Sequence, residues 1–151
     1  MGLLINILEQ GLIFSIMAIG VYITYRILDF PDLSVEGTFP LGAATAAVCL
    51  MNGINPFIAC LLAFISGSIG GVITGLLHVK LKITNLLSGI LVMIALYSIN
   101  LRIMGKSNIP LFGKDTIFTA VSNLIIIIAI FALASKIILD LFLKTKLGFI
   151  L

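Results

Sequence analysis

Long apolar runs separated by short polar stretches dominate the pattern of the chain. A helix needs about 20 residues, at roughly 1.5 Å each, to cross the ~30 Å hydrocarbon core of a membrane. Runs of that length predict an all-α, polytopic helical membrane protein with about five membrane segments in a single membrane domain, residues 1–151. The expected segments are residues 3–25, 37–51, 56–77, 83–100 and 117–143.

The composition supports a surface that faces lipid. Hydrophobic residues make up 61% of the chain and charged residues 10%, with a mean hydropathy of +1.30. Soluble domains carry roughly 25% charged residues, because water must wet their surface. The net charge of +3 comes from basic residues scattered singly between apolar runs. A nucleic-acid-binding protein clusters its basic residues on one face, so no nucleic-acid partner is expected.

The distribution of basic residues between the segments predicts the orientation, because cytoplasmic loops carry an excess of Lys and Arg. If five elements cross, one side holds Arg26, Lys80, Lys82, Lys144 and Lys146, and the other holds Arg102, Lys106 and Lys114. This bias places the C-terminus in the cytoplasm and the N-terminus outside. A re-entrant second element would change the parity of the count.

The third segment carries small residues in steps of four. In lipid, such a stripe lets a neighbouring helix backbone approach closely, which drives association through packing. The alternative interpretation is a flexible helix that acts as a hinge. The predicted packing stripe consists of Ala63, Gly67, Gly71 and Gly75, with Ser66, Gly70 and Thr74 beside it.

The stretch from Leu28 to Gly42 is the most unusual part of the sequence. It holds three carboxylates, two prolines and two glycines between two apolar runs. An uninterrupted helix is not expected here, because Pro31 and Pro40 each lack a backbone donor and each disfavours helix in the preceding residue. The second membrane segment is therefore predicted to be broken or re-entrant.

Charge and non-helical backbone at membrane depth both point to a protein-lined or water-filled cavity. We interpret the stretch as a broken helix that lines a translocation path, a common design of transporter sites. The alternative is a loop that leaves the membrane between two helices. The residues assigned to the pathway are Asp29, Asp32, Leu33, Ser34, Glu36, Gly37, Pro40 and Gly42, with Asn85 and Ser88 from the fourth segment.

Catalysis and metal binding find little support in the sequence. It contains no HExxH motif, no Gly-rich phosphate loop and no nucleophile motif, so we expect no enzymatic activity, no cofactor and no metal. Cys49 and Cys60 lie in apolar stretches without CxxC spacing, and both are interpreted as small buried hydrophobic residues. His78 has no carboxylate or Cys in local register and is interpreted as an interfacial residue.

The acidic stretch also carries a family resemblance. The run Asp32-Leu33-Ser34-Val35-Glu36-Gly37 resembles the DLSVG-type motif of ribose-type permease subunits in ATP-binding-cassette importers. The block from Ala18 to Ala43 is similar to the branched-chain amino acid permeases, and LDFPDLSVEGTFPLGAA is most similar to their tryptophan/tyrosine-type members. The C-terminal Lys146-Leu147-Gly148 resembles the basic-x-Gly step before the segment that touches the ATPase. The resemblance is strongest over residues 11–47.

The resemblance implies a permease component of an ATP-driven importer for a small solute such as an amino acid, in the bacterial plasma membrane. A full permease would have about ten membrane segments, so this chain resembles an N-terminal half. The implied partners are an ATP-binding-cassette ATPase, an extracytoplasmic substrate-binding protein, and a second permease half or homodimer partner. Near the ATPase coupling region the resemblance places Lys144, Lys146 and Gly148.

Two other functions stay open on the sequence alone. One is a small channel or secondary carrier that oligomerises through the Gly67, Gly71 and Gly75 face. The other is a membrane scaffold that transports nothing.

Overall fold

The computed structural model describes residues 2–27, 29–113, 116–117 and 124–145. Every regular element in these ranges is a helix, which confirms the predicted all-α class. In chain order they are α1 (Gly2–Tyr22), the π-helical turn η1 (Ile23–Ile27), α2 (Val35–Met51), α3 (Pro56–Leu81), α4 (Asn85–Met104) and α5 (Leu124–Leu143).

Four of the described helices are long and apolar enough to cross a membrane: α1 with its η1 extension, α3, α4 and α5. The fifth, α2, has 17 residues. The predicted segments therefore correspond to helices, although α3 and α4 each extend four residues further than expected, to Leu81 and Met104. The expected start of the last segment, residue 117, lies in a turn; residues 118–123 lie outside the described ranges, and α5 is described from Leu124.

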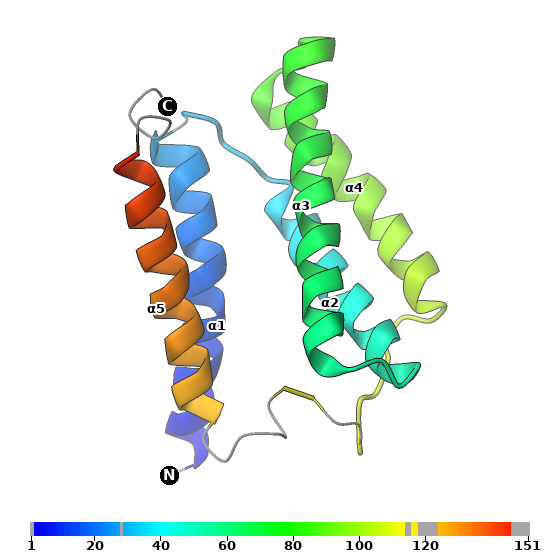
Figure 1. The fold of residues 1–151 in the computed structure, drawn as a ribbon. Coiled ribbons are helices and arrows are strands. Elements are labelled where there is room, and N and C mark those ends of the chain that lie inside the picture. The colour runs from blue at the N-terminus through cyan, green and yellow to red at the C-terminus, as the bar shows by residue number, and fades with distance from the viewer. Residues whose placement is uncertain (1, 28, 114–115, 118–123, 146–151) are drawn as a thin grey trace. The chain divides into compact units, whose positions relative to one another are not determined.

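The chain forms two compact units, the first made of Met1–Phe30 with Val121–Leu151 and the second of Pro31–Ala120. In the first unit, α1 and α5 pack side by side and run in the same direction (Figure 1). Two membrane-crossing helices with the same direction require an odd number of crossings between them. The parallel pair therefore supports counting α2, α3 and α4 as three crossings, and disfavours a re-entrant α2.

In the second unit, α2 and α4 run in the same direction and α3 runs opposite to both (Figure 1). Local hydrogen bonding and backbone conformation explain where α3 starts and where α4 ends. The Asn55 side chain accepts a hydrogen bond from the backbone N–H of Phe57 at 2.9 Å, and Pro56 occupies the first turn of α3. Gly105, with φ of +67°, ends α4 in the left-handed conformation that glycine favours. The predicted start at Pro56 is confirmed.

The core of the second unit is small and apolar. Leu41 of α2 packs against Val92 and Leu96 of α4, with Leu77 of α3 partly buried beside them. These side chains bring all three helices together around the first half of α2. That half of α2 includes Glu36 and Gly37 of the predicted pathway.

The predicted helix break at Pro40 is wrong. Helix α2 runs from Val35 through Pro40 without interruption, and the non-helical backbone lies earlier, in residues 29–32 with a turn at 33–34. A proline removes one helical hydrogen bond, but membrane helices tolerate that loss when neighbouring helices pack around them. Here α3 and α4 both pack against α2. The expectation holds at Pro31, where the chain is not helical.

Candidate functional site

Asp32 forms the start of α2. Its Oδ1 accepts a hydrogen bond from the backbone N–H of Ser34 at 2.8 Å, and the carbonyl of Ser34 accepts from Gly37 and Thr38, each at 2.9 Å. A carboxylate in this position satisfies a donor that the helix leaves free and complements the positive end of the helix dipole. Asp32 is therefore a capping residue of α2.

The Asp32–Ser34 turn rests directly on α4. A Cβ added to Gly89 would lie 2.8 Å from the backbone nitrogen of Leu33 and 3.3 Å from Oδ1 of Asp32. Only a glycine at this place on α4 leaves room for the turn. The sequence interpretation did not single out Gly89, although an isolated glycine within a helical pattern is a signal of close backbone approach.

Asn85 and Ser88 lie in the first turn of α4, beside this contact. Ser88 is fully buried, and its hydroxyl donates to the carbonyl of Asn85 at 2.8 Å. The structure thus gives Ser88 a hydrogen bond within its own helix. The assignment of Asn85 and Ser88 to a translocation pathway stays a prediction.

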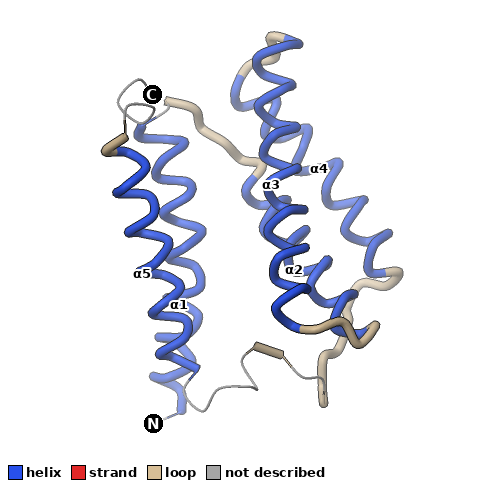
Figure 2. Tube along the Cα trace, in the orientation of Figure 1, coloured by secondary structure: helices blue, strands red, loops and turns tan. Residues whose placement is uncertain are grey.

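The first turn of α2 lies well inside the length of α3. Thr38 faces Gly70, which precedes the last residue of α3, Leu81, by 81 − 70 = 11 residues. At 1.5 Å per residue this is roughly 16 Å along the helix axis. Figure 1 and Figure 2, which share one orientation, show α2 starting partway along α3. The non-helical turn before α2 instead rests on Gly89, the fifth residue of α4. A broken helix within the membrane therefore stays a prediction.

A partly open cavity of ≈ 320 Å³ lies between α2 and α4. It combines a carboxylate, a phenol and an amide with apolar walls, the mixture typical of small-molecule sites. By contrast, a hollow of ≈ 350 Å³ between α3 and α4 is lined by Ile, Leu, Val and Ala side chains alone. The lining of the α2–α4 cavity consists of Glu36, Gly37, Pro40, Met93, Ile94, Tyr97 and Asn100.

Asn100 is the most constrained polar side chain of this cavity. It is 5% exposed, its Nδ2 donates to the carbonyl of Gly37 at 3.3 Å, and its Oδ1 has no hydrogen-bond partner. The amide orientation follows from chemistry, because a flipped amide would place two oxygens against each other. The sequence interpretation missed Asn100 and Tyr97. Their role depends on the pairing of α2 with α4, which the sequence pattern does not reveal.

The pathway residues predicted from the motif divide between this cavity and the helix contacts. Glu36 is exposed and lines the cavity together with Gly37 and Pro40. Ser34 is buried and Leu33 is 37% exposed. The remaining residues are Gly42, which faces Ala63 of α3, and Asp29, which is exposed, has φ of +49° and belongs to the first unit.

Helices α2 and α3 meet along residues that lie beside the predicted stripe. A Cβ on Gly70 would lie 2.6 Å from Cγ2 of Thr38, and Thr74, one turn further along α3, is 1% exposed. Further along α2, the hydroxyls of Thr45 and Ser66 lie 3.2 Å apart. The close helix contact expected in this segment is therefore present, with Gly70 at its tightest point.

The predicted stripe itself has two kinds of surroundings. Ala63 and Gly67 lie near α2, since a Cβ on Gly67 would be 3.9 Å from the Thr38 carbonyl oxygen. Within the described ranges, nothing lies within 4 Å of a Cβ placed on Gly71 or Gly75. A packing role for these two glycines stays a prediction.

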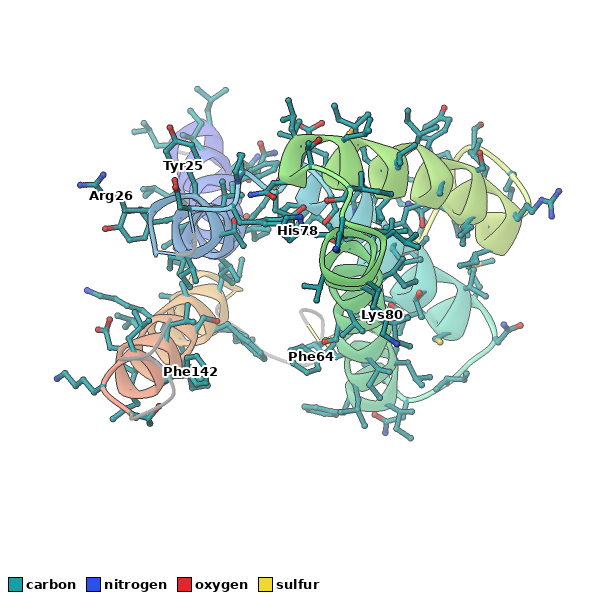
Figure 3. All side chains as sticks on the ribbon, turned by 90° about the horizontal axis from the view of Figure 1, so that it is seen from above. Tyr25, Arg26, Phe64, His78, Lys80 and Phe142 are labelled. Carbon is teal, nitrogen blue, oxygen red and sulfur yellow. The ribbon has the colours of Figure 1, made fainter. Side chains whose placement is uncertain are left out.

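His78 has a structural bond at the end of α3. Its Nδ1 lies 2.8 Å from the carbonyl oxygen of Ile83, so the Nδ1–H donates across the short connection to α4. Lys82, in this connection, adopts the left-handed conformation with φ of +53°. His78 and Lys80 leave α3 on different sides (Figure 3). This arrangement gives His78 the task of holding the α3–α4 connection.

Two sets of residues complete the predicted sites. Lys144 is exposed just after α5, and Lys146 and Gly148 lie outside the described residues.

Cys49 is buried, but Cys60 is exposed on α3. The interpretation of both cysteines as buried residues is therefore wrong for Cys60. Among the described residues, no cluster of three His, Cys, Asp or Glu side chains could hold a metal ion.

Comparisons with known proteins identify the family of the chain. The family described as "Branched-chain amino acid transport system / permease component" matches residues 3–151. The "Tyrosine transport system permease protein" of Clostridioides difficile (strain R20291) is 56% identical over 148 residues, covering 98% of this chain and 50% of the relative. "Uncharacterized protein RP368" of Rickettsia prowazekii (strain Madrid E) is 42% identical over 119 residues, covering 79% of this chain and 42% of the relative.

The chain spans about half the length of the curated relatives it matches. No solved structure matches it. The resemblance inferred from the acidic stretch and its neighbours is confirmed.

Proposed function

The chain belongs to the family of permease components of branched-chain amino acid transport systems, and we propose that it forms part of the translocation pathway of an ATP-driven importer. It is a multi-pass integral membrane protein of the bacterial plasma membrane. Its contribution to transport would be the cavity between α2 and α4.

The depth of Glu36 is the observation that carries this proposal. Glu36 lines the cavity with Met93, Tyr97 and Asn100, which lie in the middle and second half of α4. A carboxylate at the level of the middle of a membrane-crossing helix is expensive unless it faces protein or water, and such residues typically mark substrate or ion routes. A role in capping explains Asp32. Glu36 lies in the first turn of α2, where its charge complements the helix dipole, but unlike Asp32 it also lines the cavity.

The proposed transport system needs partners outside this chain. We propose a separate ATP-binding-cassette ATPase that hydrolyses ATP, an extracytoplasmic binding protein that delivers the solute, and a second permease half or homodimer partner. The proposed substrate is an aromatic amino acid. It is supported by the name of the relative from Clostridioides difficile, a tyrosine transport system permease protein.

The test is uptake by the complete importer, reconstituted in proteoliposomes with its ATPase and binding protein. Replacing Glu36 by Gln keeps the size of the side chain and removes its charge, and should lower ATP-dependent uptake of radiolabelled L-tyrosine about tenfold or more. Glu9→Gln on α1 is the matched control and should leave uptake unchanged. Equal uptake by the wild type and Glu36→Gln would remove Glu36 from the mechanism.

The same proteoliposomes test the alternative of a channel or secondary carrier. The glycine face of α3 at Gly71 and Gly75 has no neighbour within the described ranges, which leaves room for oligomerisation. That alternative requires tyrosine flux in vesicles that hold the permease without ATPase or ATP. Absence of such flux, with full activity in the complete system, supports the importer.

A further inference from the structure

Pro40 changes the hydrogen bonding of the residue one turn before it. In a regular helix the N–H at position 40 would donate to the carbonyl oxygen of Glu36, but proline has no N–H. The Glu36 carbonyl is thereby left without its helical donor. Glu36 and Pro40 both line the cavity between α2 and α4, so this oxygen belongs to a residue of the cavity wall.

Acceptors outnumber donors in this cavity. Besides the Glu36 carbonyl, the residues that line the cavity carry the Glu36 carboxylate and the Oδ1 of Asn100, a buried atom that has no partner. One of the two N–H groups of the Asn100 amide is already directed to the Gly37 carbonyl. A buried acceptor without a partner costs about 1–3 kcal/mol. A ligand that brings several N–H donors would remove that penalty.

We propose that the cavity binds the primary ammonium group of the transported solute, with Asn100 and Glu36 as its acceptors. This proposal rests on the proposed translocation function and specifies the solute as an amine or amino acid. An ammonium group carries three donors and no acceptor, which matches a wall of acceptors around a negative charge. Asn100 then contributes to specificity, because it distinguishes a donor-rich group from an apolar one.

The size and the other walls of the cavity favour an organic solute over a bare metal cation. Its volume of ≈ 320 Å³ is roughly ten times the ~30 Å³ that a water molecule occupies in the liquid. Met93, Ile94 and the ring of Tyr97 supply an apolar surface beside the acceptors. An apolar or aromatic solute side chain would fill this part while its ammonium group meets Glu36 and Asn100.

The experiment measures binding to the full-length permease with its ATPase, in nanodiscs without ATP or binding protein. The probes are tyramine, which has the ammonium group, and 3-(4-hydroxyphenyl)propionate, which lacks it. Saturation-transfer NMR detects each probe after subtraction of the signal from empty nanodiscs. The test variants are Glu36→Gln and Asn100→Leu, with Glu9→Gln and Asn52→Leu as matched controls, because Asn52 lies exposed at the other end of α2.

We expect the tyramine signal to exceed the propionate signal about fivefold or more, and each test variant to reduce it by a similar factor. The two control variants should bind tyramine as the wild type does. Equal signals for the two probes would overturn the proposal. So would unchanged tyramine binding by Glu36→Gln, whose exposed position tolerates the change without loss of the fold.

Two further results would also count against the proposal. If Glu36→Gln loses tyramine binding but a folded Asn100→Leu retains it, Asn100 has no part in the site. If NaCl suppresses the tyramine signal while an equal concentration of N-methylglucamine chloride does not, the cavity belongs to an inorganic cation.

The uptake assay separates this proposal from the proposed function. Loss of uptake in Glu36→Gln together with equal binding of both probes would keep the pathway and reject the ammonium site. Ammonium-selective binding together with unchanged uptake would keep the site and reject its place in the pathway.

Discussion

The methyl group of Thr38 on α2 occupies the space that a side chain on Gly70 of α3 would need. A Cβ built on Gly70 would lie 2.6 Å from Thr38 Cγ2, and contacts under 3.0 Å force a shift. In lipid, helix association depends on such close packing, because no hydrophobic effect drives it. The position of the first turn of α2 against α3 therefore depends on the absence of a side chain at residue 70.

Replacing Gly70 by Ala should accordingly destabilise the full-length permease by about 1–3 kcal/mol, the usual effect of overpacking a tight contact. Denaturant titration in detergent, followed by circular dichroism, measures the free energy of unfolding. Gly71→Ala is the matched control, since nothing described lies within 4 Å of that position. An equal loss in both variants would contradict the assignment of the contact to Gly70. It would instead support the predicted packing role of Gly71.

Gly89→Ala should displace the Asp32–Ser34 turn. The added Cβ would lie 2.8 Å from the Leu33 backbone nitrogen, and backbone yields less easily than the end of a side chain. We expect a loss of about 1–3 kcal/mol in unfolding free energy. Ser98→Ala, on an exposed part of α4, should cost less than about 0.5 kcal/mol. Wild-type stability in Gly89→Ala would show that the turn does not rest on α4.

Asp32 allows capping to be separated from charge. Asp32→Asn retains an oxygen that accepts from the Ser34 N–H, whereas Asp32→Ala removes it. The Ala variant should lose about 0.5–2 kcal/mol of stability and the Asn variant much less. Unfolding measurements on both variants check this. If Asp32→Asn is as unstable as Asp32→Ala, the carboxylate charge, and not the hydrogen bond, stabilises the start of α2.

The hydroxyls of Thr45 and Ser66 should couple α2 to α3 weakly. They lie 3.2 Å apart, and interhelical hydrogen bonds in membranes average ~0.6 kcal/mol. A double-mutant cycle with Thr45→Val and Ser66→Ala should give a coupling energy of about that size. Strict additivity of the two substitutions would mean that each hydroxyl bonds only to its own helix, Thr45 to the Leu41 carbonyl and Ser66 to the Ala63 carbonyl.

Apolar run length predicted the helices well, because crossing a membrane imposes a length that few other constraints disturb. The same reasoning failed at Pro40. Proline propensity describes a helix alone in water, while α2 is held on two sides by α3 and α4. The local rule held at Pro31, where residues 29–32 are not helical.

The site was only partly predictable for a related reason. The motif identified Glu36 and Gly37, but Asn100 reaches the cavity because α4 runs parallel to α2, across 63 residues of sequence. The packing face of α3 was also ambiguous. Small residues occupy two adjacent faces of that helix, and only the position of Thr38 selects the one with Gly70. The neighbouring helices determine which face of a helix is packed, and the periodicity of one helix does not reveal where its neighbours lie.

The shortness of α2 affects the electrical profile across the membrane. Its 17 residues cover roughly 25 Å, whereas the 26 residues of α3 cover roughly 39 Å. If water fills the non-helical segment before α2, the low-dielectric barrier is thinner along α2 and the membrane voltage falls over a shorter distance there. Moving one charge through the full voltage is worth about 2.3 kcal/mol per 100 mV. A cation held at Glu36 would then have crossed part of that drop before any helix moves.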